Sequence, residues 1–79
     1  MSVRLDQRLP ELFRAVFELP ESADPTGCEQ SNTPAWDSMA HVSLVTAIEG
    51  EFGISIDAGD SLFITSYHAA RQYLADRGV

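Results

Sequence analysis

The stretch "TPAWDSMAHVSLVTAIEGEFGI", residues 33 to 54, carries the clearest structural signal in the chain. From Ser38 to about Phe52, apolar residues recur at intervals of three and four, which predicts an amphipathic helix. Ser38 suits the N-cap of this helix, and Gly53 suits a left-handed stop. We expect its buried stripe to contain Met39, Val42, Val45, Ile48 and Phe52, widened by Leu44 and Ala47.

A first helix is predicted upstream, in "RLDQRLPELFRAVFEL". Its apolar residues share one helical face, so we expect it to begin near Asp6 or Gln7 and to end around Glu18. Pro10 then falls in the first turn, where the missing amide costs nothing. Residues 19 to 35 contain three prolines and many small polar residues, which predicts a long loop. Loops of this length are uncommon in compact domains and tend to be functional or disordered.

Downstream of Gly53, the sequence predicts a connecting segment, a short helical turn and a last helix. Ile54 and Ile56 are expected to tuck the connection against the bundle, and "AGDSLF" can form the short turn. Thr65 or Ser66 caps the last helix, which carries apolar residues at helical spacing.

The predicted fold class is therefore all-α: a small four-helix bundle, with three main helices, one short helix and a long loop between the first and second. We expect a single domain over residues 1–79. The expected core consists of Phe13, Val16, Phe17, Val42, Val45, Ile48, Phe52, Ile56, Leu62, Phe63, Ala70, Tyr73 and Leu74.

Composition narrows the classes of function. Twelve acidic residues against five arginines give a formal net charge of −7, which disfavours nucleic-acid binding and favours basic protein surfaces. The single cysteine, Cys28, excludes an internal disulfide, and no metal-ligand spacing is present. No apolar run reaches the roughly 18 residues of a membrane span. We expect a free-standing, cytoplasmic monomer that does not insert into membranes.

The Asp37-Ser38 pair has three interpretations. The simplest is an ordinary helix N-cap preceded by an acidic residue. A hydrolase would combine Ser38 with His41 and Asp37, but no glycine elbow exposes the serine and Asp37 lies on the wrong side of the turn. In the third, another enzyme modifies Ser38, and the helix N-terminus accommodates the phosphodiester that results. His41 is then expected to face solvent or a partner.

Residues 36 to 54, "WDSMAHVSLVTAIEGEFGI", resemble the signature of the acyl carrier protein family, in which Asp-Ser-Leu or Asp-Ser-Met opens the second helix. The resemblance extends more weakly over the chain, to a closing "TSYHAARQYL". It implies that Ser38 carries 4′-phosphopantetheine, transferred from coenzyme A by a magnesium-dependent phosphopantetheinyl transferase. The arm would hold acyl or aminoacyl cargo as a thioester, and the carrier itself would not be a catalyst.

The resemblance also implies roles for neighbouring residues. Asp37 would attract the transferase, and Met39 would pack into partner pockets. Glu49 and Glu51 match the acidic residues with which the family docks on basic patches. Trp36 is interpreted either as a plug holding the loop down or as a contact for partners or the arm.

Departures from the family pattern leave the pathway open. Ala40, His41, Ser43 and Gly50 stand where other carriers often have carboxylates, which shifts weight towards a specialised carrier. Fatty acyl, polyketide, aminoacyl and peptidyl intermediates all remain possible cargoes, charged by a loading ligase or transferase and passed to biosynthetic enzymes. The alternative is an acidic helical interaction module without a prosthetic group.

Overall fold

The computed structural model describes residues 3–79 and confirms the all-α class. Four α-helices form within these residues: α1 (Val3–Phe17), α2 (Ser38–Phe52), α3 (Ala58–Ser61) and α4 (Tyr67–Asp76). A single 3₁₀ turn, η1 (Pro25–Gly27), lies in the long loop between α1 and α2. The described residues form no strand, although Glu29 and Ser66 make one isolated antiparallel bridge.

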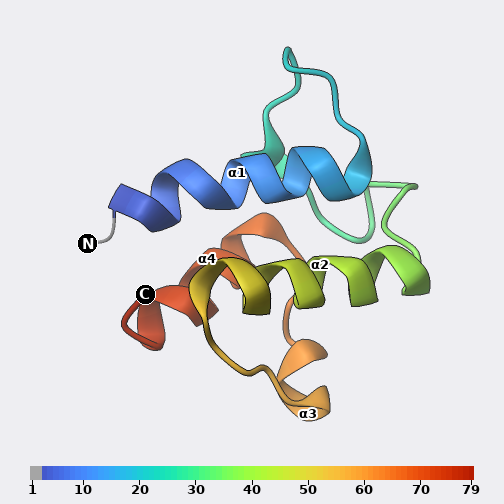
Figure 1. The fold of residues 1–79 in the computed structure, drawn as a ribbon. Coiled ribbons are helices and arrows are strands. Elements are labelled where there is room, and N and C mark those ends of the chain that lie inside the picture. The colour runs from blue at the N-terminus through green and yellow to red at the C-terminus, as the bar shows by residue number, and fades with distance from the viewer. Residues whose placement is uncertain (1–2) are drawn as a thin grey trace.

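The two long helices lie side by side and run in opposite directions, and the long loop joins the end of α1 to the start of α2 at the same side of the molecule (Figure 1). α4 also packs against α1, and both of these helices contact η1. α3 lies on the side of α2 that faces away from α1 (Figure 1). No helix within residues 3–79 combines the length and the apolar character needed to cross a membrane.

The core joins one face of each long helix. α1 contributes residues at every fourth position, which stack along one side because a turn takes 3.6 residues. Their burial leaves the exposed face of α1 to charged residues. The buried apolar residues are Leu5, Leu9, Phe13, Phe17, Cys28, Trp36, Leu44, Ile48, Phe52, Ile56, Ile64, Tyr67, Ala70 and Leu74.

α1 begins at Val3, earlier than the predicted start near Asp6 or Gln7. Leu5 is almost fully buried, so the helix extends far enough to bring it into the core. Pro10 consequently lies inside the helix rather than in its first turn, where it removes one backbone hydrogen bond. The helix stops at Phe17, next to the predicted end, and Glu18 takes a left-handed conformation with φ of 53°.

α2 has the predicted bounds, and Gly53 ends it with φ of 65°, as predicted. Its buried side is different from the predicted stripe. Leu44, Ile48 and Phe52 are buried, whereas Met39 and Val42 are 81% and 65% exposed. In the first turns of α2, Met39 and Val42 therefore continue the apolar pattern without being covered by another of the described residues.

Two more predicted core residues lie at the surface. Leu62 and Phe63 are 75% and 74% exposed, and Ile64 is buried in their place. The four-residue α3 ends at Ser61, and the Ile64 amide then donates to the Ser61 carbonyl, which turns Ile64 inward. The helical spacing of apolar residues therefore does not predict which residues are buried after α3 ends.

The long loop is tied to the bundle by its backbone. The Tyr67 amide donates to the Cys28 carbonyl and the Gln30 amide donates to the Thr65 carbonyl, at 2.9 and 3.0 Å. Cys28 is buried, so the structure does not present it for oxidation at the surface. Ser66 caps α4 by accepting from the Ala69 amide at 3.0 Å, which confirms one of the two predicted caps.

Candidate functional site

The N-terminus of α2 forms the centre of the candidate site. Asp37, not Ser38, is the N-cap residue: its carboxylate accepts a hydrogen bond from the Ala40 amide at 2.8 Å. The prediction of Ser38 as the cap was therefore wrong by one position. Aspartate satisfies the orphan amide as well as serine does and adds a negative charge at the positive end of the helix dipole.

The one-residue shift frees Ser38 from a structural task. Ser38 is the first residue of α2, it is exposed, and its hydroxyl group makes no hydrogen bond within residues 3–79. The amides of Ser38 and Met39 belong to the first turn, where no intrahelical carbonyl is available to them. An anionic group attached to this hydroxyl would therefore meet free amides and the positive end of a fifteen-residue helix.

A hollow of about 500 Å³ lies beside Ser38. Its walls come from the long loop, from the start of α2 and from the segment after α3. The lining residues are Gln30, Trp36, Asp37, Ser38, His41 and Leu62.

Trp36 forms the floor at the junction of the loop and α2. It is 7% exposed and packs its ring against Phe13 and Phe17, with centroid separations of 5.6 and 4.8 Å. These contacts support the interpretation of Trp36 as a plug that holds the loop down. Its burial leaves little of the ring for a partner to contact.

His41 connects three segments of the chain, contrary to the expectation that it faces solvent or a partner. Its Nδ1 atom accepts a hydrogen bond from the Trp36 indole at 3.0 Å, and its Nε2 atom lies 2.9 Å from the Ser61 carbonyl. Because the indole can only donate and the carbonyl can only accept, the imidazole is neutral with its proton on Nε2. The ring also stacks on Trp36. His41 thereby links the loop, α2 and the end of α3.

The hydrolase arrangement is not assembled. Both ring nitrogens of His41 have partners other than Ser38, so neither is placed to take the serine proton. Asp37 directs a carboxylate oxygen at the Ala40 amide rather than at the imidazole. The three residues are neighbours in space without the hydrogen-bond order of a triad.

A second hollow, of about 370 Å³, borders Ser38 on another side and is lined by Ser38, Met39, Val42 and Ser43. Ser38 therefore lies between Met39 and Val42 on α2 and Leu62 beyond α3. We call Ser38, Met39, Val42 and Leu62, which line these two hollows, the Ser38 face. Its three apolar members, together with Phe63, are the large hydrophobic residues that are exposed in the described part of the chain.

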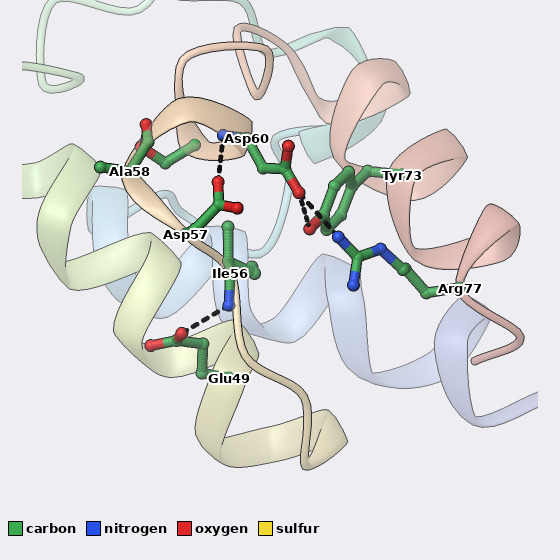
Figure 2. A network of polar contacts seen from close by, with 8 residues as sticks. Glu49, Ile56, Asp57, Ala58, Asp60, Tyr73 and Arg77 are labelled. Atoms are coloured by element: carbon green, nitrogen blue, oxygen red, sulfur yellow. Dashed lines mark hydrogen bonds and ion pairs between the residues drawn. The ribbon is translucent and has the colours of Figure 1, made fainter.

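The two carboxylates at the end of α2 are engaged inside the fold. Glu49 accepts from the Ile56 amide at 2.7 Å, which fixes the segment after Gly53 (Figure 2). Glu51 pairs with Arg8 at 3.2 Å and with Arg4 at 3.3 Å, joining α2 to α1. The hydrogen bond from Arg8 is the main reason that the pKa of Glu51 is lowered. A partner that docked on Glu49 or Glu51 would therefore compete with these internal contacts.

The acidic residues around α3 are also engaged, as Figure 2 shows. Asp57 accepts from the Asp60 amide at 2.7 Å and caps α3. Asp60 accepts from the Tyr73 hydroxyl at 2.8 Å and from Arg77 at 2.6 Å, which joins α3 to α4. Desolvation first, and the hydrogen bond to Asp60 second, raise the pKa of Tyr73.

The sequence-predicted site residues thus divide into two groups. Asp37, Ser38 and Met39 meet at an exposed helix start, with Trp36 beneath them, whereas Glu49 and Glu51 serve the fold. Leu62 was missed as a site residue because helical periodicity assigned it to the core. Gln30 was missed because it lies in a loop whose path the sequence does not indicate.

The described residues contain no group of three His, Cys, Asp or Glu side chains placed to hold a metal ion. Comparisons of the chain with protein-family models, curated proteins and solved structures found no match.

Proposed function

We propose that this chain is a carrier protein whose Ser38 is modified with 4′-phosphopantetheine. The arm would hold an acyl or aminoacyl group as a thioester and present it to partner enzymes. A thioester supplies the acyl-transfer reactivity, and the tether supplies a high local concentration of cargo. The chain's own task is to expose Ser38, anchor it and orient it.

The observation that carries the proposal is the state of Ser38. It is exposed, it is released from capping by Asp37, and it stands at the start of a helix anchored in the core by Leu44 and Ile48. A serine that served only the fold would be expected to satisfy an amide or to be covered. The resemblance of "DSM" and the residues that follow to carrier proteins points to the same hydroxyl.

The residues present fit a phosphodiester at this position. The first-turn amides of α2 can face its oxygens, and the adjoining hollow of about 500 Å³ offers room beside the serine. Asp37 keeps one carboxylate oxygen on the cap, and its exposure leaves the group accessible to the metal or basic surface of a transferase.

Intact-mass measurement after incubation with coenzyme A, magnesium and a broad-specificity phosphopantetheinyl transferase tests the proposal. We expect one added phosphopantetheine in the wild-type chain and none in Ser38→Ala. Ser43→Ala is the matched control, since Ser43 is an exposed serine on the same helix, and it should gain the same mass. No gain with several transferases, or a gain that persists in Ser38→Ala, would reject the proposal.

A second candidate is an interaction module without a prosthetic group. The exposed apolar residues of the Ser38 face favour it, because such a patch can serve binding alone. The same measurement separates the two, since an interaction module would remain unmodified while still folding.

A further inference from the structure

We propose that His41 is a positioning residue that holds the hollow beside Ser38 in shape while its ring is neutral and releases it when the ring is protonated. We call His41, with its hydrogen bonds to Trp36 and Ser61, the His41 clasp. The clasp is a property of the unmodified chain. Its effect on the modification of Ser38 rests on the proposed function.

The two hydrogen bonds of the clasp require a neutral ring in one tautomer. The Trp36 indole can only donate, so Nδ1 of His41 accepts from it at 3.0 Å. The Ser61 carbonyl can only accept, so Nε2 carries the ring proton and donates at 2.9 Å. A second proton, taken from water, can bind only at Nδ1. That atom is the one that faces the indole N–H.

Protonation would therefore break the clasp on one side. Two N–H groups would face each other, and the indole of Trp36, a residue that is only 7% exposed, would lose its acceptor. The Ser61 carbonyl would still accept from Nε2, and a positive charge on the ring strengthens that bond. The long loop is thus released while the end of α3 stays attached to α2.

The charges around the clasp allow the ring to take up this proton. The long loop, α2 and residues 53–66 contain none of the five arginines of the chain, and there is no lysine. Arg77 of α4 pairs with Asp60 at 2.6 Å. Nearby carboxylates stabilise a positive imidazole, and imidazole side chains titrate between about pH 5 and 8. The carboxylates on the segments that meet His41 are Glu29 and Asp37 beside the hollow, Glu49 and Glu51 on α2, and Asp57 and Asp60 at α3.

The clasp adjoins the position proposed for modification. His41 follows Ser38 by three residues, about one helical turn, and both line the hollow together with Trp36 and Leu62. Trp36 is the second residue before Ser38, so its release loosens the floor of the hollow and the backbone that leads into the serine. His41 acts through Trp36, since both of its ring nitrogens have partners other than the serine hydroxyl.

The unmodified chain tests the clasp by spectroscopy. Between about pH 8 and about pH 5.5, the emission of Trp36 should shift to the red and its quenching by acrylamide should increase, while circular dichroism shows that the fold persists. Nitrogen shifts of the His41 ring should show the proton on Nε2 at about pH 8. The wild-type titration needs no variant, so a folding defect elsewhere cannot remove this test.

Two variants supply the matched comparison. His41→Asn keeps an acceptor near the place of Nδ1 and does not titrate, so the emission and quenching of Trp36 should be independent of pH. His68→Asn, at an exposed position of α4, should follow the wild-type chain.

The transferase reaction tests the positioning role. The ratio of the wild-type KM to the His41→Asn KM, measured with one transferase at each pH, removes the pH dependence of the enzyme itself. From about pH 8 to about pH 5.5 this ratio should rise roughly three- to tenfold, the effect of losing one hydrogen bond that orders the site. The corresponding ratio for His68→Asn should stay constant.

The outcomes separate the inference from the proposed function. Emission and quenching of wild-type Trp36 that stay constant over this range, or that change equally in a folded His41→Asn chain, overturn the inference and leave the proposed function standing. A KM ratio that does not change with pH also overturns the positioning role. A wild-type chain that responds to pH as expected but is modified by no transferase overturns the proposed function and leaves the clasp standing.

Discussion

The two halves of α2 are used differently. In the C-terminal half, Ile48 and Phe52 are buried and the carboxylates of Glu49 and Glu51 are bound within the chain. In the N-terminal half, Met39 and Val42 are exposed beside a serine without a hydrogen-bond partner among the described residues. One helix therefore anchors the fold at one end and presents an exposed serine at the other. The difference teaches that apolar periodicity alone does not identify the core.

The strongest test of this difference between the halves of α2 is to truncate one apolar residue in each half and compare the free energies of unfolding. Ile48→Ala should lower the free energy of unfolding by about 2–5 kcal/mol, because it leaves a cavity at a fully buried site. Val42→Ala should change it by less than about 0.5 kcal/mol, since Val42 is exposed. Urea unfolding followed by circular dichroism measures both. Equal losses would show that Val42 is also part of the core.

The next largest effect on stability is expected at His41, which links the long loop to the end of α3. His41→Ala should cost about 1–3 kcal/mol, because it leaves the buried Trp36 indole without an acceptor. His68→Ala, at an exposed position of α4, is the matched control and should have little effect. Emission from Trp36, the one tryptophan of the chain, should shift only in the His41 variant. An unchanged spectrum there would contradict the contact.

The C-terminal end of α2 can be examined through two glycines, Gly50 in its last turn and Gly53 just after it. Gly53→Ala should destabilise the chain by about 1–2 kcal/mol, because residue 53 has a left-handed backbone with φ of 65°. Gly50→Ala should instead stabilise it by up to about 1 kcal/mol, because Gly50 lies within the helix and an added Cβ meets no atom within 4 Å. Thermal unfolding of the two variants should give shifts of opposite sign, and shifts of the same sign would refute this assignment.

At the start of α2, helix capping and the proposed modification should depend on different residues, Asp37 and Ser38. Asp37→Ala should lower stability by about 1 kcal/mol through loss of the bond to the Ala40 amide. Ser38→Ala should leave stability nearly unchanged while abolishing the proposed modification. Asp37→Asn, which retains a side-chain oxygen, should restore most of the lost stability. A larger loss in Ser38→Ala than in Asp37→Ala would return the cap to Ser38.

The smallest effect on stability is expected from the ionisation of Glu51 at acidic pH. The hydrogen bond from Arg8 lowers the pKa of Glu51 in the folded chain, so its contribution is present at neutral pH and is lost as pH falls below about 4.5. Glu51→Gln should therefore reduce the pH dependence of stability in that range. Glu21→Gln is the control at an exposed loop position. Unfolding midpoints between about pH 3 and 7 give the comparison, and identical slopes in all three chains would count against the ion pairs.

The local signals in the sequence predicted much of the fold. The bounds of α2, the Gly53 stop, the Ser66 cap and the packing of Ile56 follow from residue types and their spacing, which is local information. The sequence could not place Val42, Leu62 and Phe63, because their burial depends on where neighbouring helices end. Periodicity gives the apolar face of a helix without giving the length over which another element covers it.

The site was predicted less completely. Ser38 and Met39 are both exposed, although Met39 was predicted in the buried stripe, and the cap assignment was wrong by one residue. The contacts of His41 with Trp36 and Ser61 depend on tertiary placement, because Ser61 lies twenty positions away in the chain. The internal use of Glu49 and Glu51 likewise depends on partners in other segments.

The most direct test of the account is to map the adduct on the chain after reaction with coenzyme A and a broad-specificity phosphopantetheinyl transferase. Fragment mass spectrometry of the peptide containing Ser38 and Ser43 distinguishes the two hydroxyl groups. The account predicts a single phosphopantetheine on Ser38, with Ser43 unmodified. An adduct on any other residue, or an unmodified peptide after reaction with several transferases, would contradict it.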